Sequence, residues 1–253
     1  MNFLLTENTE IAPGVWRMQL SGDARAVRRP GQFAQVKVPG LYLRRPISIC
    51  DWRPTEKGGV TLVYKVVGHG TEGMSQMKIG ESVDALLPLG NGFDVDETDA
   101  PKSTQAPLLV GGGVGTPPLY GLCRRLKAIY KQPTVVLGFG TKSEILLREE
   151  FESLGVRTII TTMDGSEGIR GLVTDAMAQL ECEYDYVYAC GPEPMLKAVC
   201  QTADKRGVRG QYSFEERMAC GFGACMGCSC QTKYGAKRIC KDGPVLMGEE
   251  IVW

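Results

Sequence analysis

Up to about residue 100, the chain consists of short runs in which apolar and polar residues alternate or β-branched residues predominate. Pro-Gly and Gly-Gly pairs separate these runs, and such pairs mark turns between strands. Strands at this spacing predict a small antiparallel β-barrel. The expected strands cover residues 15–20, 32–38, 45–49, 60–67 and 82–87.

The pattern changes after a polar, acidic stretch at residues 94–106, which we interpret as a linker. Beyond it, short apolar runs alternate with longer segments of helical character. This alternation predicts a parallel sheet with ligands at the carboxyl ends of its strands. The expected strands are residues 107–110, 134–139, 157–162 and 184–189, and the expected helices run from the Gly-rich segment 111–118 to about 130, and over 144–154, 173–180 and 193–203.

The last segment of the chain is short and rich in cysteine. We therefore expect three units: an antiparallel β-barrel at residues 1–100, an α/β domain with a parallel sheet at 101–210, and a small cysteine-bearing domain at 211–253. A chain of 253 residues is long enough to bury a core in each of the two larger units.

Charge and composition exclude several classes of function. The 29 Lys and Arg residues equal the 29 Asp and Glu residues, so no overall field attracts nucleic acid or an anionic membrane. No apolar run approaches the roughly 18 residues of a membrane helix, and the acidic N-terminus does not resemble a signal peptide. Ten cysteines without an export signal lead us to expect reduced thiols and a cytoplasmic protein.

The most specific motif lies near the C-terminus. Four residues separate Cys220 from Cys225, two separate Cys225 from Cys228, and Cys240 follows at a distance. This is the spacing of a plant-type [2Fe–2S] site, in which thiolates hold two irons. Small residues between the cysteines leave room for backbone N–H groups to point at the sulfur atoms: Gly221, Gly223, Ala224 and Gly227.

Two alternatives exist for these cysteines. A structural zinc site usually takes two Cys-x-x-Cys knuckles, but only Cys225 and Cys228 form such a pair. Cys230 offers a different ligand set, but a single residue between two ligands fits this type of site poorly. We therefore expect Cys230 not to bind the cluster.

Two stretches of the expected barrel carry candidate chemistry. Residues 44–48, Arg-Arg-Pro-Ile-Ser, place a cation and a hydroxyl on a strand. Residues 63–71 run from a strand into a Gly-rich turn, and a short helix expected at 71–77 would present backbone N–H groups to a phosphate. Each stretch taken alone is also compatible with an ordinary strand end or turn. His69, the only histidine, is expected to be a turn residue rather than a base.

The expected parallel sheet has two candidate ligand-binding ends. Gly113, Gly115 and Thr116 follow its first strand, but Thr116 stands where a dinucleotide fingerprint would have its third glycine. Cys190 follows the last expected strand. A small buried hydrophobic role is the alternative for Cys190, as it is for four other cysteines: Cys50, Cys123, Cys182 and Cys200.

Taken in order, these motifs resemble the ferredoxin–NADP reductase superfamily. The resemblance rests on four stretches: Arg-Pro-Ile-Ser at 45–48, Gly-His-Gly-Thr at 68–71, the Gly-rich run with Thr-Pro-Pro-Leu at 111–119, and Cys-Gly-Pro-Glu-Pro-Met at 190–195. The run from Phe214 to Cys228 further resembles the electron-transfer subunits of type B dihydroorotate dehydrogenases. The resemblance covers essentially the whole chain.

The resemblance implies a role for each motif. The barrel would bind FAD, the parallel-sheet domain would accept NADH, and Cys190 would lie close to where nicotinamide meets the flavin. The last domain would hold the [2Fe–2S] cluster through Cys220, Cys225, Cys228 and Cys240. The residues implied for FAD are Arg45, Pro46, Ile47, Ser48, Val63, Tyr64, Lys65, Gly70 and Thr71, and those for NAD are Gly113, Gly115 and Thr116.

The chemistry of these groups forms a relay. NADH delivers two electrons as a hydride, the cluster accepts one at a time, and a flavin converts between the two. Such a relay needs no general base. The resemblance implies that a partner, an FMN-containing dihydroorotate dehydrogenase catalytic subunit of pyrimidine (UMP) biosynthesis, oxidises the substrate in a heterotetramer with two of each chain.

Two other interpretations remain open. A related NAD(P)H reductase subunit would serve ferredoxin, sulfur reduction or a hydrogenase, and a zinc-bearing assembly subunit would have kept the fold but lost the flavin. The choice between NAD and NADP is also open. Asp164 would disfavour a 2′-phosphate, whereas Lys142 would favour one.

Overall fold

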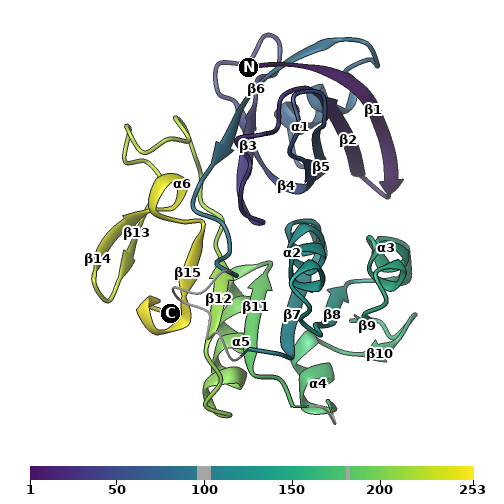
Figure 1. Ribbon diagram of the computed structural model, residues 1–253, viewed down its shortest axis with the longest axis vertical. Coiled ribbons are helices and arrows are strands. Elements are labelled where there is room, and N and C mark those ends of the chain that lie inside the picture. Colours follow the sequence, from purple (N-terminus) through teal and green to yellow (C-terminus); the bar gives the residue numbers. More distant parts are fainter. Residues whose placement is uncertain (96–103, 181–182) are drawn as a thin grey trace.

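The computed structural model describes residues 1–95, 104–180 and 183–253. Its first domain is a closed antiparallel barrel with strand order β1-β2-β5-β4-β3-β6, drawn in purple and blue in Figure 1. The elements of the barrel are β1 (Asn2–Ala12), β2 (Val15–Ser21), β3 (Phe33–Val36), β4 (Arg45–Arg53), β5 (Gly59–Lys65), α1 (His69–Ser75) and β6 (Ser82–Leu89). The expected barrel is therefore confirmed.

Strand β1 was not predicted, and its composition explains why. Only its first half alternates buried and exposed residues, with Phe3 and Leu5 in the barrel core. The second half is polar, and pairing with β2 through backbone hydrogen bonds holds it in place. The short helix also differs slightly from expectation, because it begins at His69 rather than Thr71.

The second domain is a seven-stranded sheet of order β10-β9-β8-β7-β11-β12-β15, in which only β15 runs antiparallel to its neighbour. The expected parallel sheet is confirmed. Its strands are β7 (Pro107–Gly112), β8 (Thr134–Phe139), β9 (Arg157–Thr162), β10 (Ile169–Arg170), β11 (Tyr186–Cys190), β12 (Gly210–Ser213) and β15 (Val245–Met247). The helical elements are η1 (Gly113–Gly115), α2 (Thr116–Ala128), η2 (Lys142–Glu144), α3 (Arg148–Ser153), α4 (Val173–Ala178) and α5 (Glu193–Asp204).

One expected helix is divided in two. The segment 144–154 was predicted as a single helix, but Leu147 adopts a left-handed conformation with φ of 57° between η2 and α3. A left-handed residue cannot continue a right-handed helix, so α3 has to begin at Arg148. The interruption places Ile145 and Leu146 along the wall of a pocket described below.

The C-terminal segment is not a separate unit. It contains the hairpin β13 (Ser229–Thr232) and β14 (Gly235–Arg238), then α6 (Ile239–Asp242), β15 and η3 (Gly248–Glu250). Because β15 pairs with β12, the chain leaves the sheet and returns to its edge (Figure 1). The predicted boundary between residues 210 and 211 therefore falls inside β12.

The three parts of the chain contact one another closely. Asn91, after the last barrel strand, donates from Nδ2 to the Val245 carbonyl and accepts from the Val245 N–H, at 2.8 and 3.1 Å. The expected linker at 94–106 lies partly outside the described residues, as does Cys182. None of the helices in the part of the chain that the structure describes is both long and apolar enough to cross a membrane.

Candidate functional site

The expected flavin motifs meet at one edge of the barrel. Arg45 begins β4, and its guanidinium packs directly over Gly70 in the first turn of α1. A Cβ at position 70 would lie only 1.7 Å from Arg45 Nε, so no other residue fits there without moving the guanidinium. Arg45 Nη1 donates to the carbonyls of Leu43 and Arg44, at 2.5 and 3.4 Å, and makes no ion pair among the described residues.

Thr71 shapes the turn that leads into α1. Its hydroxyl accepts the Val67 N–H at 2.9 Å and donates to the Gly68 carbonyl at 3.1 Å. These bonds close the turn and leave the N–H groups at the start of α1 without partners inside the helix. Together with Arg45, they make a site with the positive character that a pyrophosphate needs.

The three residues expected to line the flavin on β5 do not share a face. Val63 packs in the core between the barrel and α2, whereas Tyr64 points into the barrel. The Tyr64 hydroxyl donates to Asn8 Oδ1 at 3.0 Å, and burial raises the pKa of that hydroxyl. Lys65 is exposed at the end of the strand. Side chains alternate along a strand, so Val63 and Lys65 lie on one face of β5 and Tyr64 lies on the other. Tyr64 can therefore contact a ligand on the face of Val63 and Lys65 only through its backbone.

The two candidate ends of the parallel sheet are in contact. A Cβ on Gly115 would lie 2.3 Å from the Cys190 carbonyl oxygen and 2.6 Å from Gly191 Cα. Only a glycine therefore allows the carboxyl ends of β7 and β11 to approach this closely. The hydroxyl of Thr116 is fully buried and has no hydrogen-bond partner among the described residues. The sheet end thus brings together all the residues expected to accept NADH.

Cys190 lies at this junction, and its thiol is buried there. Burial raises the pKa of the thiol to about 12. Cys50, Cys123 and Cys200 are also buried, as expected of small hydrophobic residues. The thiol of Cys190 therefore contributes shape to the site rather than protons.

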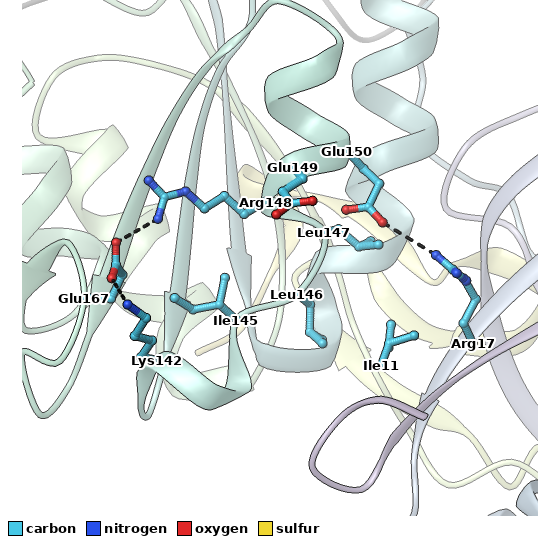
Figure 2. Close-up of a pocket in the computed structure, with 10 residues that line it drawn as sticks. All are labelled: Ile11, Arg17, Lys142, Ile145, Leu146, Leu147, Arg148, Glu149, Glu150 and Glu167. Atoms are coloured by element: carbon cyan, nitrogen blue, oxygen red, sulfur yellow. Dashed lines mark hydrogen bonds and ion pairs between the residues drawn. The ribbon is translucent and has the colours of Figure 1, made fainter. Parts of the chain in front are cut away.

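A pocket of about 410 Å³ opens between the barrel and the parallel-sheet domain (Figure 2). Arg17 on β2 and Glu150 on α3 face each other across it, with Arg17 Nη1 3.6 Å from Glu150 Oε1. On the opposite side Glu167 accepts from two cations, Lys142 Nζ at 3.0 Å and Arg148 Nη1 at 2.8 Å. The bonds from Arg148, and then those from Lys142, lower the pKa of Glu167.

The sequence pointed to Lys142 and Asp164 here, but not to Glu167 or Arg148. Ser166 joins the region together: its Oγ accepts the Lys142 N–H at 2.8 Å and donates to Asp164 Oδ1 at 2.6 Å. Glu167 is 25 residues from Lys142 in the chain, and only the return of the chain after β9 brings them into contact. Lys142 is therefore not a free cation.

Backbone hydrogen bonds link the four motif cysteines two by two. The Cys225 N–H donates to Cys220 Sγ at 3.5 Å, and the Cys240 N–H donates to Cys228 Sγ at 3.3 Å. Cys228 and Cys240 are buried, whereas Cys225 is exposed on the loop. Among the described residues, no three His, Cys, Asp or Glu side chains are grouped as a single metal ion would require. Four cysteines suit a [2Fe–2S] cluster, which four thiolates hold.

Backbone N–H groups already converge on the first cysteine of the loop. Burial raises the pKa of Cys220, but hydrogen bonds from the N–H groups of Cys225, Phe222 and Ala224 outweigh it and lower that pKa to about 6. The loop therefore stabilises a thiolate, which is the form that binds iron. Gly221 and Gly223 adopt φ of 78° and 88°, conformations that let the chain wrap around this sulfur.

Arg238 joins the cysteine loop (residues 220–228, the cluster loop) to α6; together with the hairpin β13–β14, these elements form the cluster module (residues 214–244). Arg238 Nη1 donates to the Gly223 carbonyl at 3.0 Å, and its Nε donates to Asp242 Oδ2 at 3.0 Å. Cys230 lies on β13 opposite Lys237, away from these bonds. Cys230 packs against the core that contains Cys228 and Cys240, and its expected role as a non-ligand stays a prediction.

Comparisons with known proteins agree with this geometry. Residues 215–252 match the iron-sulfur cluster binding domain of dihydroorotate dehydrogenase B, and residues 109–201 match the oxidoreductase NAD-binding domain. Among solved structures, one reported as an NADH-dependent reduced ferredoxin-NADP oxidoreductase involved in flavin-based electron bifurcation is 33% identical, with a TM-score of 0.88. It covers 99% of this chain and 90% of its own.

Two relatives are similar over nearly their whole lengths. The dihydroorotate dehydrogenase B (NAD(+)) electron transfer subunit of Shouchella clausii is 42% identical over 98% of this chain and 96% of its own. Its counterpart from Bacillus caldolyticus is 43% identical over 96% of this chain and 94% of its own. The chain therefore belongs to the family of dihydroorotate dehydrogenase B (NAD(+)) electron transfer subunits.

Proposed function

We propose that this chain passes electrons between NAD(H), FAD and a [2Fe–2S] cluster, and exchanges them with an FMN-containing dihydroorotate dehydrogenase catalytic subunit in pyrimidine biosynthesis. The observation that carries this proposal is the position of the cysteine loop, which is linked to Cys240 of α6 through the Cys240 N–H bond to Cys228 Sγ and whose Gly221 packs against β3 of the barrel. β3 pairs with β4, the strand that carries Arg45 and Ser48. The cluster loop and the flavin strand therefore both contact β3.

Each part of the chain has a defined task in this proposal. Arg45 and the first turn of α1 bind the pyrophosphate of FAD, and the flavin supplies the conversion between two-electron and one-electron transfer. The nicotinamide would pack against the junction of Gly115 with Cys190 and Gly191. Cys220, Cys225, Cys228 and Cys240 would hold the [2Fe–2S] cluster, which would accept electrons one at a time.

The pocket in Figure 2 supports the use of NAD rather than NADP. A 2′-phosphate needs unpaired cations, but Glu167 binds both Lys142 and Arg148. Its carboxylate would also repel the added phosphate. The proposed preference for NAD therefore rests on the carboxylate of Glu167, which neutralises Lys142, and not on the lack of a cation.

Replacing Glu167 with Gln should relax this preference. We expect the ratio of kcat/KM for NADPH to that for NADH to rise about two- to fivefold, the size of an exposed charge interaction. Steady-state reduction of ferricyanide with each nucleotide measures this ratio. Glu149→Gln is the matched control, because Glu149 lines the same pocket but contacts neither cation; an equal rise in both variants would contradict the assignment.

The partner would dock beside the cluster loop. Phe222 and Met226 lie on this loop and are 57% and 54% exposed, so two apolar side chains face the surface beside Cys220 and Cys225. We propose that they contact the catalytic subunit, in an assembly with two of each chain. We also propose a cytoplasmic location, because the nine described cysteines are all free thiols.

An anaerobic visible spectrum before and after NADH tests the proposed function. We expect flavin bands with a broad absorption toward longer wavelengths, and both should bleach when NADH is added. Flavin bands without the long-wavelength absorption would contradict the cluster assignment. A colourless protein would contradict the whole proposal and favour a zinc-bearing assembly subunit.

A second candidate is a reductase subunit that delivers electrons to another acceptor. The similarity over 99% of this chain to the NADH-dependent reduced ferredoxin-NADP oxidoreductase favours it. The two functions differ in what drives turnover. NAD reduction that depends on dihydroorotate, in a complex reconstituted with the catalytic subunit, would exclude the second candidate.

A further inference from the structure

Strand β3 separates the barrel core from the cluster loop. All four of its residues are buried, but they face two different environments. Ala34 and Val36 pack inside the barrel, whereas Phe33 packs in the same core as Cys228 and Cys240. Since side chains alternate along a strand, Gln35 shares the outward face with Phe33 and lies on the side of the cluster module.

The carboxamide of Gln35 lacks a partner in the protein. The side chain is 0% exposed, yet neither Nε2 nor Oε1 has a hydrogen-bond partner among the described residues. Gln211, the other fully buried glutamine in this part of the chain, is satisfied: its Nε2 donates to the Asp94 carbonyl at 2.9 Å, and its Oε1 accepts the Asp94 N–H at 2.8 Å. A buried amide without partners is destabilising, so Gln35 needs a partner that the described part of the protein does not supply.

The surroundings of Gln35 identify that group. A Cβ on Gly221 would lie 2.4 Å from Gln35 Nε2, so the amide nitrogen lies against the residue that follows Cys220. On the neighbouring strand, Gln35 is opposite Pro46 and Phe33 is opposite Ser48, which places the flavin strand directly beside it. The amide therefore lies between the strand expected to bind FAD and the loop expected to bind the cluster.

The donor set favours the cluster over the flavin. The Cys225 N–H reaches Cys220 Sγ from within the loop, at 3.5 Å. Gln35 approaches the same segment from the barrel side, where its side chain occupies the space that a Cβ on Gly221 would take. A cluster accepts hydrogen bonds through its sulfur atoms and donates none, which suits an amide with its nitrogen nearest the loop.

We propose that Gln35 donates a hydrogen bond from its carboxamide to the sulfur atoms of the cluster at Cys220 and thereby raises the reduction potential of the cluster relative to that of the flavin. This inference rests on the proposed function. A reduced cluster carries more negative charge than an oxidised one, so a donor stabilises the reduced form more. Gln35 thus favours the movement of each electron from the flavin to the cluster.

The test is Gln35→Met in the complete, cofactor-loaded chain, because Met is of similar size but donates no hydrogen bond. Potentiometric titration with EPR detection should show a lower cluster potential and altered g values, with the flavin potential unchanged. The equilibrium between reduced flavin and reduced cluster should shift about three- to tenfold toward reduced flavin, the size of one hydrogen bond. Gln211→Met, which removes a satisfied buried amide, should leave both potentials unchanged.

The outcomes separate the inference from the proposed function. An unchanged cluster potential and EPR signal in Gln35→Met would overturn the inference, and so would a shift confined to the flavin, which would assign the amide to that group. If Gln35→Met loses the cluster, the second variant is Gln35→His, which keeps a hydrogen-bond donor at this position. Retention of the cluster in Gln35→His would support the inference, and loss of the cluster in both variants would overturn it. A wild-type chain without a cluster signal would instead contradict the proposed function.

Discussion

Cys225→Ser should purify with its flavin but without its cluster. Cys225 is exposed on a loop and contributes nothing to the hydrophobic core, so the fold should be unaffected. Changes even in the residues around metal ligands cost about 10- to 100-fold in metal affinity, and removal of a ligand should cost more. Iron and sulfide content, together with the long-wavelength absorption of the purified chain, would measure the loss.

The same variant should separate the two halves of the relay. NADH should still reduce the flavin, so ferricyanide reduction should continue, while transfer to the catalytic subunit should fall by about a hundredfold or more. Cys230→Ser is the matched control, since Cys230 lies on β13, is not one of the four motif cysteines and should retain iron. If Cys230→Ser lost iron while Cys225→Ser kept it, the assignment of ligands would be wrong.

Arg45→Ala should weaken FAD binding by about 10- to 100-fold, the range expected for loss of a charge-assisted bond to a phosphate. The guanidinium of Arg45 contacts the first turn of α1 and has no carboxylate partner among the described residues, so its charge is available to a ligand. Titration of the flavin-free variant with FAD, followed by fluorescence quenching, would give the dissociation constant.

The neighbouring arginine provides the control for this prediction. Arg44 Nη2 donates to Asp84 Oδ2 at 2.6 Å, and Arg44 Nη1 donates to the Asp84 carbonyl at 3.0 Å. Arg44→Ala should therefore lower the melting temperature of the barrel with little effect on FAD affinity. Gly70→Ala keeps the charges of Arg44 and Arg45 but displaces the Arg45 guanidinium, so it should also weaken FAD binding. Equal affinities in the Arg44 and Arg45 variants would contradict the flavin site.

The sequence predicted best where the chemistry is local. The cluster site depends on spacing within residues 220–240, and loop geometry follows from spacing and small residues. The barrel and the parallel sheet followed from periodicity in the same way. Gly115 was identified as a candidate, although its reason, the approach of Cys190 to within contact distance, is visible only in the structure.

Features that depend on distant pairing could not be predicted. The polar half of β1 forms a strand because β2 is beside it, and β15 forms one because β12 is at the edge of the sheet. Glu167 and Gln35 could not be predicted for the same reason. Glu167 neutralises Lys142, which is distant in the chain, and the carboxamide of Gln35 attracts attention only because it is buried without a hydrogen-bond partner. Neither property is encoded by the residues next to it in sequence.

The return of the chain to the sheet has a consequence for how such proteins diversify. The cluster module leaves from β12 and comes back as β15, and Gln211 is paired with Met247 across these strands. Paired residues on antiparallel strands lie only about 5 Å apart, so the module is an insertion with adjoining ends. Closing a longer or shorter insertion changes the free energy only slowly with length. A different redox module could therefore be exchanged at this point while the flavin and nucleotide domains keep their packing.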